Sequence, residues 1–349
     1  MNWMIYGATG YTGELIAREA VRRGLKPVLA GRSRERVTAL AQELGCKASA
    51  FGLDDAERLA AKIQDHSLVM HCAGPFSATA QPMMEACLRA GAHYLDITGE
   101  IGVFELAQAL DSLASDKGVV ICPGVGFDVI PTDCVAATLK AALPDATHLA
   151  LGFDTNLGLS PGTAKTSVEG LAQGGKLRRD GKIVTVPLAY EVRRIDFGNG
   201  EKTAMTIPWG DVSTAYHSTG IPNIEVFIPG ERSMILGTKI ANLFRPLLGL
   251  AFVQKQLKKR IAGKVKGPSE ESRAQTPTFV WGEARNARGD KKTARIRTIN
   301  PYSLTIFGAL AVVEFLLANK PAGGSYTPSR LVGADLVTRL PGSGSMQVS

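Results

Sequence analysis

Short apolar runs alternate with longer amphipathic segments along the first 124 residues of the chain. Runs that are apolar on both faces, separated by segments long enough for a helix, are typical of parallel strands that helices cover on both sides. The pattern therefore predicts an α/β fold that begins with a doubly wound parallel sheet. The six predicted strands are Trp3 to Tyr6, Pro27 to Ala30, Ala48 to Phe51, Leu68 to Cys72, His93 to Ile97 and Val119 to Cys122.

Small and polar residues mark the ends of the intervening helices. Ser33 and Thr79 stand where N-caps are expected, and Pro82 fits the first turn of a helix. Glycines in the left-handed conformation commonly end helices. The glycines that we expect to do so are Gly24, Gly45, Gly91 and Gly118.

The pattern of apolar and polar residues changes beyond Pro131. One helix is predicted from Pro131 to Leu143, and alternating stretches joined by glycine-containing turns follow it. We therefore expect a second, α+β domain with a mostly antiparallel sheet. The predicted division is a Rossmann domain over 1–130, a β-rich substrate domain over 131–300, and a segment over 301–349 whose helix returns to the first domain. The alternating stretches are Leu149 to Phe153, Ile183 to Pro187, Tyr190 to Phe197, Thr203 to Ile207, Ile224 to Ile228, Thr278 to Glu283 and Thr293 to Thr298.

A glycine-rich turn joins the first predicted strand to the first helix. Its glycines have the spacing G-x-x-G-x-x-G, which brings backbone N–H groups and a helix N-terminus close to a pyrophosphate. A strand-to-helix turn that only needs a positive φ is the simpler alternative. The residues predicted to bind a dinucleotide here are Gly7, Ala8, Thr9, Gly10, Tyr11, Thr12 and Gly13.

The end of the second predicted strand indicates which nicotinamide cofactor is used. NAD-binding sites usually place Asp or Glu there to bind the ribose hydroxyls. This chain has no acidic residue directly after Gly31 and continues instead with Arg32 and Ser33, with Arg36 three residues further on. Two guanidinium groups and a hydroxyl suit a 2′-phosphate. We therefore expect NADP(H) in preference to NAD(H).

Each of the six predicted strands has a glycine at or just beyond its carboxyl end, which is the edge where open α/β sheets bind ligands. The segment after the fourth strand is predicted to wall the nicotinamide side, with Gly99 after the fifth strand beside it. Its residues are Cys72, Ala73, Gly74, Pro75 and Phe76.

Four motifs together resemble the saccharopine dehydrogenase-like oxidoreductases, and in particular the trans-acting enoyl reductase group. The tail from Gly323 to Pro328 is also similar to that group. The resemblance implies an NADP-linked reductase and leaves the substrate open. The motifs are Gly7 to Gly13, Cys72 to Phe76, Tyr94 to Glu100 and Pro123 to Asp133.

Proton donors are harder to predict than cofactor contacts. The candidate catalytic residues are Lys165, Tyr216, His217 and Asp128, and each also has a purely structural interpretation. A short-chain dehydrogenase is disfavoured because no tyrosine has a lysine four residues later. A semialdehyde or acyl-phosphate reductase would instead use a thiolate at Cys122 or Cys134, for which a buried, inert thiol is the alternative.

Composition limits the remaining choices. A hydrophobic content of 45% with 21% charged residues is ordinary for a globular protein, and the net charge of +8 favours anionic partners without the long basic tail typical of nucleic-acid binding. Five cysteines without metal spacing suggest reduced thiols, no metal and a cytoplasmic location. Strand character from Trp3 leaves no room for a leader, and no uncharged run is as long as a membrane span.

The stretch 233–266 crowds apolar residues ahead of a basic cluster. It fits either a peripheral membrane contact, with the basic residues near anionic headgroups, or a protein contact such as a helical hairpin or a homodimer. Either way, the apolar content favours a hydrophobic small-molecule substrate.

The sequence thus predicts an NADP-dependent oxidoreductase that reduces a hydrophobic enoyl or carbonyl substrate. A protein that binds NADP as a sensor or scaffold without turnover is the alternative from another class.

Overall fold

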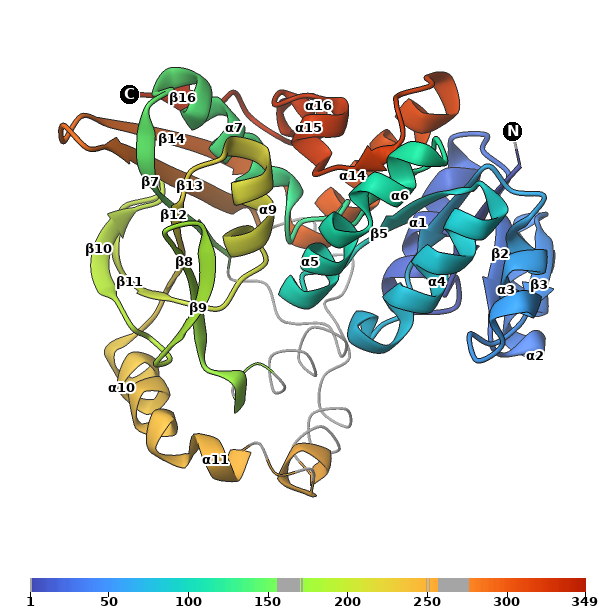
Figure 1. Cartoon of the computed structure of the whole chain (residues 1–349), viewed down its shortest axis with the longest axis horizontal. Helices are drawn as coiled ribbons and strands as arrows, with labels where there is room; N and C mark the ends of the chain where they lie inside the picture. Colours follow the sequence, from blue (N-terminus) through green and yellow to red (C-terminus); the bar gives the residue numbers. More distant parts are fainter. Residues whose placement is uncertain (1, 156–169, 171, 249, 251, 257–275) are drawn as a thin grey trace. The chain divides into compact units, whose positions relative to one another are not determined.

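The computed structural model describes residues 2–155, 170, 172–248, 250, 252–256 and 276–349 (Figure 1). The chain divides into two compact units. The first comprises Met1–Ile130 and Tyr302–Leu336, and the second comprises Pro131–Pro301 and Val337–Ser349. The structure thus differs from the predicted division at the C-terminus, because the last residues lie in the second unit. The short strand β16 (Gln347–Val348) explains this, since it pairs with β14 (Lys291–Thr298) of that unit.

The first unit contains a seven-stranded sheet with the order β15-β6-β5-β4-β1-β2-β3, and every pair in it is parallel. The predicted Rossmann-type sheet is therefore confirmed. All six predicted strands are present with ends shifted by at most one residue, and β15 is too short to predict from its sequence. The strands are β1 Trp3–Tyr6, β2 Val28–Gly31, β3 Lys47–Ala50, β4 Leu68–His71, β5 His93–Asp96, β6 Val120–Cys122 and β15 Gly324–Ser325.

The glycines predicted to end helices all have positive φ, and two of them, Gly45 and Gly91, are the left-handed C-caps of their helices. Ser33 is confirmed as an N-cap, because its hydroxyl accepts a hydrogen bond from the Arg36 N–H. The helices of the first unit are α1 Tyr11–Arg22, α2 Arg34–Leu44, α3 Ala56–Ile63, α4 Phe76–Ala90, α5 Ile101–Ala109, α6 Asp111–Asp116, α14 Pro301–Ala318 (from Tyr302), α15 Pro328–Val332 and α16 Leu336–Arg339 (its first residue).

The predictions for the start of α4 were wrong. The helix begins at Phe76, so that Thr79 and Pro82 both lie inside it. The early start has a tertiary cause. The Glu100 carboxylate, from the segment after β5, accepts hydrogen bonds from the backbone N–H groups of Phe76 at 3.0 Å and Ser77 at 2.7 Å. A cap supplied from 24 residues away satisfies the first N–H groups of the helix, and the local sequence does not reveal it.

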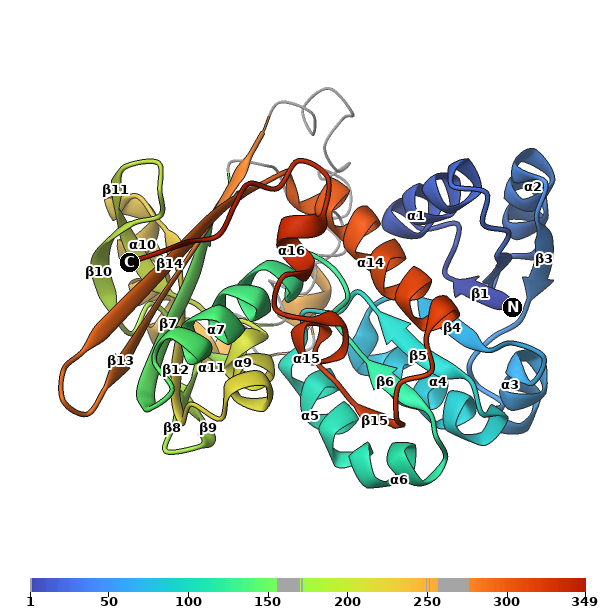
Figure 2. The ribbon, with the colours of Figure 1, turned by 90° about the horizontal axis from the view of Figure 1, so that it is seen from above.

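Helix α14 runs alongside α1 in the first unit (Figure 2). The rings of Tyr11 and Tyr302 meet edge to face with centroids 5.4 Å apart, and Arg23 forms an ion pair of 3.2 Å with Glu314. Both pairs have the same sequence offset of 291 residues, so the two helices are parallel and begin at the same end of the sheet. The Thr305 hydroxyl also accepts a hydrogen bond from the backbone N–H of Phe127 after β6.

Among the described residues, α14 alone is long and apolar enough to cross a membrane, and 44% of that stretch is buried inside the protein. Length and composition are weak evidence for a span here, because the core helix of a folded domain has the same properties.

The second unit is built on a mixed sheet with the order β10-β11-β12-β7-β13-β14-β16, and a hairpin of β8 and β9 joins it at β12. The pair β7 and β12 is parallel and the other pairs are antiparallel, which confirms the mostly antiparallel second domain. The predicted strands are present, but β8 was missed. The strands are β7 Ala146–Asp154, β8 Gly175–Arg179, β9 Lys182–Val186, β10 Val192–Asp196, β11 Glu201–Thr206, β12 Asn223–Pro229, β13 Thr278–Asn286 and β14 Lys291–Thr298.

Helices α7 (Ile130–Ala142, from Pro131) and α9 (Asp211–Thr219) belong to this unit. Helix α7 lies tightly on β13, because a Cβ atom at Gly282 would come within 2.6 Å of Val135 and 2.8 Å of Leu139. The Ser218 hydroxyl of α9 donates a hydrogen bond to the Asp133 carboxylate of α7. Asp133 therefore links α7 to α9.

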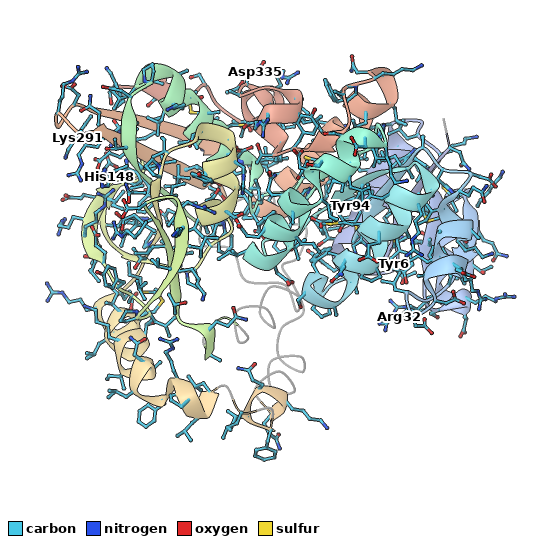
Figure 3. The ribbon with its side chains drawn as sticks, in the orientation of Figure 1. Tyr6, Arg32, Tyr94, His148, Lys291 and Asp335 are labelled. Carbon is cyan, nitrogen blue, oxygen red and sulfur yellow. The ribbon has the colours of Figure 1, made fainter. Side chains whose placement is uncertain are left out.

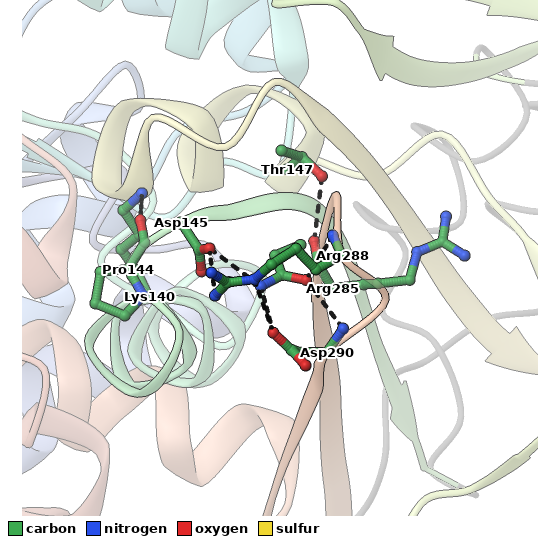
Figure 4. Close-up of polar contacts among 8 residues, drawn as sticks. Lys140, Pro144, Asp145, Thr147, Arg285, Arg288 and Asp290 are labelled. Carbon is green, nitrogen blue, oxygen red and sulfur yellow. Dashed lines mark hydrogen bonds and ion pairs between the residues drawn. The ribbon is translucent and has the colours of Figure 1, made fainter.

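The hairpin between β13 and β14 is fastened to the start of β7 by a polar cluster (Figure 4). Asp145 accepts hydrogen bonds from the Asn286 amide and from the Arg288 guanidinium, the latter at 3.0 Å. Asp290, on the hairpin itself, accepts from the same two residues. Most of this cluster is exposed, so we expect it to fix the turn rather than to add much stability.

We predict that limited proteolysis will not release a folded fragment that ends near residue 145. Such a fragment lacks β15, which pairs with β6, and α14, which packs on α1. The fragments can be identified by mass spectrometry, with the intact chain under the same conditions as the reference. A fragment ending near residue 145 that unfolds cooperatively would contradict this interpretation.

Candidate functional site

The glycine turn after β1 is held against the neighbouring strands through backbone contacts. The N–H groups of Gly7 and Ala8 both donate to the Ala30 carbonyl of β2, at 2.8 and 3.1 Å. Gly7 has a φ of +84°, and a Cβ atom there would come within 2.7 Å of the Ala73 backbone nitrogen. Gly7 is thus required both by its conformation and by the close approach of the segment after β4.

Helix α1 approaches the same turn without an intervening side chain. A Cβ atom at Gly13 would lie 2.3 Å from the Gly7 carbonyl oxygen, and Gly10 is an N-cap that has no side chain to cap the helix. The start of α1 is therefore lined by backbone. This arrangement fits the phosphates of a dinucleotide, which bind at helix N-termini through N–H groups and the helix dipole.

The two arginines after β2 have different environments. The Arg36 guanidinium donates a hydrogen bond of 2.8 Å to the Thr9 carbonyl oxygen, so it lies directly on the glycine turn. Arg32 is exposed at the end of β2, near Tyr6 (Figure 3). Burial raises the pKa of Tyr6, and the charge of Arg32 opposes that rise. Within the described ranges, no hydrogen bond or ion pair engages the Arg32 guanidinium.

A buried carboxylate that the sequence analysis missed organises the loops beyond β5 and β6. Asp96 accepts hydrogen bonds from the Thr98 N–H at 2.9 Å, the Gly124 N–H at 2.8 Å and the Tyr94 hydroxyl at 2.6 Å. Burial raises the pKa of Asp96 to about 6, and the three hydrogen bonds oppose that rise. An acidic residue at the end of an otherwise apolar strand was the signal that could have identified it.

Asp128 lies on the loop after β6, directly against Gly99. A Cβ atom at Gly99 would come within 2.7 Å of the Asp128 Oδ2 atom. Asp128 is half-buried, and its removal from solvent raises the pKa of its carboxyl to about 7. The structure therefore brings two predicted site residues into contact, one predicted to bind cofactor and the other to act in catalysis.

The predicted wall after β4 lies beside the glycine turn. Ala73 contacts Gly7, whereas Gly74 has space around it, since the nearest atom to a Cβ there would be on the Phe76 ring at 3.6 Å. Three strand spacings separate β2 from β5 in the sheet. At about 4.8 Å each they span roughly 14 Å, which suits a dinucleotide extended from the arginines to Gly99.

The thiols do not have the surroundings of a catalytic nucleophile. Cys122 and Cys134 are fully buried. Burial raises the pKa of the Cys72 thiol, and the negative charge of Asp96 raises it further by a smaller amount. An activated cysteine requires the opposite, an electropositive and accessible setting. In the part of the chain that is described, no group of three His, Cys, Asp or Glu side chains could hold a metal ion.

The remaining catalytic candidates lie elsewhere. Tyr216 and His217 belong to the second unit and lie in helix α9. The Arg178 guanidinium lies 4.2 Å from the centroid of the Tyr216 ring, and it donates to two backbone carbonyls at 2.6 Å. These contacts give Tyr216 a structural role at the β8–β9 hairpin. Lys165 lies outside the described residues.

A parallel sheet with a backbone-lined glycine turn at a central strand, and arginines after the next strand, defines a dinucleotide-binding domain. Residues 3–122 match the family model described as the saccharopine dehydrogenase NADP-binding domain. The resemblance predicted from the motifs is therefore confirmed over residues 3–122, which are similar to the saccharopine dehydrogenase NADP-binding domain.

Curated relatives agree with this assignment. The human saccharopine dehydrogenase-like oxidoreductase is 27% identical over 208 residues, which cover 50% of this chain and 47% of that protein. A putative trans-acting enoyl reductase of Mycobacterium tuberculosis is 34% identical over 153 residues, covering 41% of this chain and 36% of that protein. The alignments thus span about half the length of these relatives or less. Both are named as oxidoreductases or reductases, the class that the sequence predicted.

A solved structure resembles the chain over its full length. Saccharopine dehydrogenase (L-Glu forming) from Saccharomyces cerevisiae matches with a TM-score of 0.68 and covers 100% of this chain and 99% of that chain. The sequence identity is only 11%, so this likeness concerns the fold alone.

We predict that Gly13→Ala will weaken NADPH binding by at least about tenfold, because the added methyl group forces α1 away from the Gly7 carbonyl. Gly102→Ala in α5 is the matched control, since a Cβ there meets nothing within 4 Å. Isothermal titration calorimetry measures both. Equal affinities for the two variants would show that the close approach of α1 does not matter for binding.

Proposed function

We propose that this chain is an NADPH-dependent reductase that acts on a hydrophobic enoyl or carbonyl substrate. The observation that carries the proposal is the backbone-lined glycine turn with Arg36 bonded to it and Arg32 exposed beside it. When bound, NADPH would supply a hydride. The glycine turn would bind the diphosphate, and the segment from Cys72 to Phe76 together with Gly99 would contact the nicotinamide side.

The preference for NADP(H) over NAD(H) rests on the end of β2. Arg32 has an exposed guanidinium, and its planar fork can donate two hydrogen bonds to a phosphate. Arg36 is held in place by its bond to Thr9 and retains further donors for the same group. Ser33 caps α2 through its side chain, so its contribution to the cofactor is expected to be smaller than that of the arginines.

Arg32→Ala is therefore expected to weaken NADPH binding by about tenfold to a hundredfold, the loss of roughly 1.5–3 kcal/mol for a charge-assisted hydrogen bond. NADH binding should change little, because NADH has no 2′-phosphate. Comparing the affinity ratio of the two cofactors in the variant and the parent protein isolates this contact. Arg34→Ala on the exposed first turn of α2 is the control, and an unchanged ratio in Arg32→Ala would contradict the proposed preference.

The proton for the reduced substrate is proposed to come from Asp128. Its carboxyl lies against Gly99, at the sheet edge where the nicotinamide side is expected, and its pKa of about 7 allows it to hold a proton at neutral pH. The candidates Tyr216 and Lys165 lack this support, the first because of its structural contacts and the second because it lies outside the described residues. His217 remains an open alternative on α9.

A hydrophobic substrate is supported by two considerations. Relatives of this chain include proteins named enoyl reductases, and apolar side chains are abundant on the second unit. Turnover can be tested by following NADPH absorbance with long-chain enoyl thioesters and ketones. NADPH binding without consumption of any of them would favour the alternative of a sensor or scaffold that binds NADP.

If Asp128 donates the proton, kcat/KM should be constant below about pH 7 and fall about tenfold per pH unit above it, because the protonated form is lost as the pH rises. Asp128→Asn should lower kcat by about 10²-fold or more and abolish that limb of the profile. Asp116→Asn, at an exposed helix end, is the control. Retention of the wild-type pH profile in Asp128→Asn would assign the proton donor to another group.

A further inference from the structure

Helix α10 (Arg232–Ala241) and the segment after it carry a row of exposed apolar side chains. The row continues through the 3₁₀ turn η1 (Asn242–Phe244) and α11 (Arg245–Leu248). Four leucine and isoleucine positions follow one another at spacings of four, three and four residues, which is the spacing typical of one helix face, and the third of them lies in the 3₁₀ turn. This apolar stripe consists of Leu236, Ile240, Leu243 and Leu247, flanked by Phe244 and Phe252.

The exposure of the stripe is large for side chains of this type. Leu243 is 79% exposed and Phe252 is 71% exposed, and the other members of the stripe are between 47% and 60% exposed. Single exposed apolar residues are common, but a contiguous patch marks an interaction surface. The described residues of the chain leave this face uncovered, so a hairpin that buries it within the protein is not what they form.

The opposite side of α10 is anchored to the second unit. Ile235 is buried against Ala189 and Met205. The Asn242 side chain mimics a backbone pairing, because it accepts from the Leu188 N–H at 2.7 Å and donates to the Leu188 carbonyl at 3.1 Å. Turning the apolar stripe toward the protein would break these contacts. The stripe therefore faces the solvent.

The charge around the stripe is of one sign. Between residues 232 and 266 the sequence has nine basic residues and no acidic residue. Arg232, Lys239 and Lys255 are exposed in the structure. The segment carries more positive charge than the net +8 of the chain, so the rest of the chain is close to neutral. The partner of the stripe is therefore expected to be anionic as well as apolar.

Self-association through this face is disfavoured by the same charges. A two-fold symmetric dimer places a surface against its own copy, so each basic segment would face another one. An anionic lipid surface has no such conflict. It accepts apolar side chains at the level of the acyl chains and attracts nearby lysine and arginine side chains at the headgroups.

We propose that the apolar stripe of α10 to α11 docks on an anionic lipid surface, with α10 lying in the plane of the interface. With ten residues, the helix is too short to cross a bilayer. The docking is peripheral and reversible, and it does not depend on the proposed reductase activity.

Flotation of the full chain with vesicles tests the proposal. Vesicles of equal parts phosphatidylglycerol and phosphatidylcholine should bind the protein at 0.1 M salt, and pure phosphatidylcholine should bind it at least about tenfold more weakly. Raising the salt to 1 M shortens the screening length from about 10 Å to about 3 Å and should release most of the bound protein.

Two double variants separate the contributions. Leu243→Ser with Leu247→Ser removes apolar contact, and Lys239→Glu with Lys255→Glu reverses charge; each should lower binding by at least about tenfold. All four side chains are exposed, so the thermal unfolding midpoint should not change. Leu113→Ser, at another exposed leucine in α6 of the first unit, is the control and should bind as the parent protein does.

Light scattering after gel filtration measures whether the chain forms a dimer instead. Absence of binding to anionic vesicles at low salt would overturn the proposal. So would a dimer that the Leu243→Ser and Leu247→Ser double variant converts to a monomer, because the stripe would then be covered by a second copy of the chain.

Discussion

Close backbone contact at the glycine turn is the constraint on which the candidate site depends. Gly7 abuts the Ala73 backbone on one side, and on the other its carbonyl is approached by Gly13 so closely that no Cβ fits between them. These contacts hold β1, the segment after β4 and α1 around the turn, and no side chain separates α1 from the Gly7 carbonyl. Two further proposed cofactor contacts depend on this arrangement, since Arg36 bonds to the same turn and Ala73 of the predicted nicotinamide wall contacts it.

Two aspartates lie at the loops that follow β5 and β6. Asp96 holds the loops after β5 and β6 together through three hydrogen bonds, and Asp128 packs on Gly99 between those loops. Burial raises both pKa values, and at Asp96 the three hydrogen bonds oppose that rise.

Local patterns predicted most of the fold because each pattern has a local cause. The strands of the first sheet follow from continuous apolar runs, and the helix ends follow from glycines that adopt positive φ. The start of α4 could not be predicted, because Glu100 caps it from a different segment. Strand β15 and helix α9 were missed for related reasons. The first is two residues long and exists only through its pairing with β6, and the second has a weak apolar pattern. Within the site, the glycines and arginines were evident from spacing, whereas the role of Asp96 emerges only when three segments meet around it.

The path of the chain has a consequence for its synthesis. The first unit is interrupted after Ile130 and is completed only when Tyr302–Leu336 has been made, about 200 residues later. At typical rates of about 5–20 residues per second, the outer edge of β6 and the α14-facing side of α1 would wait roughly 10–40 s on the ribosome without their partners. Edge strands and apolar helix faces in that condition are the surfaces that molecular chaperones bind, so the nascent chain is expected to rely on such assistance more than a protein whose domains are continuous in sequence.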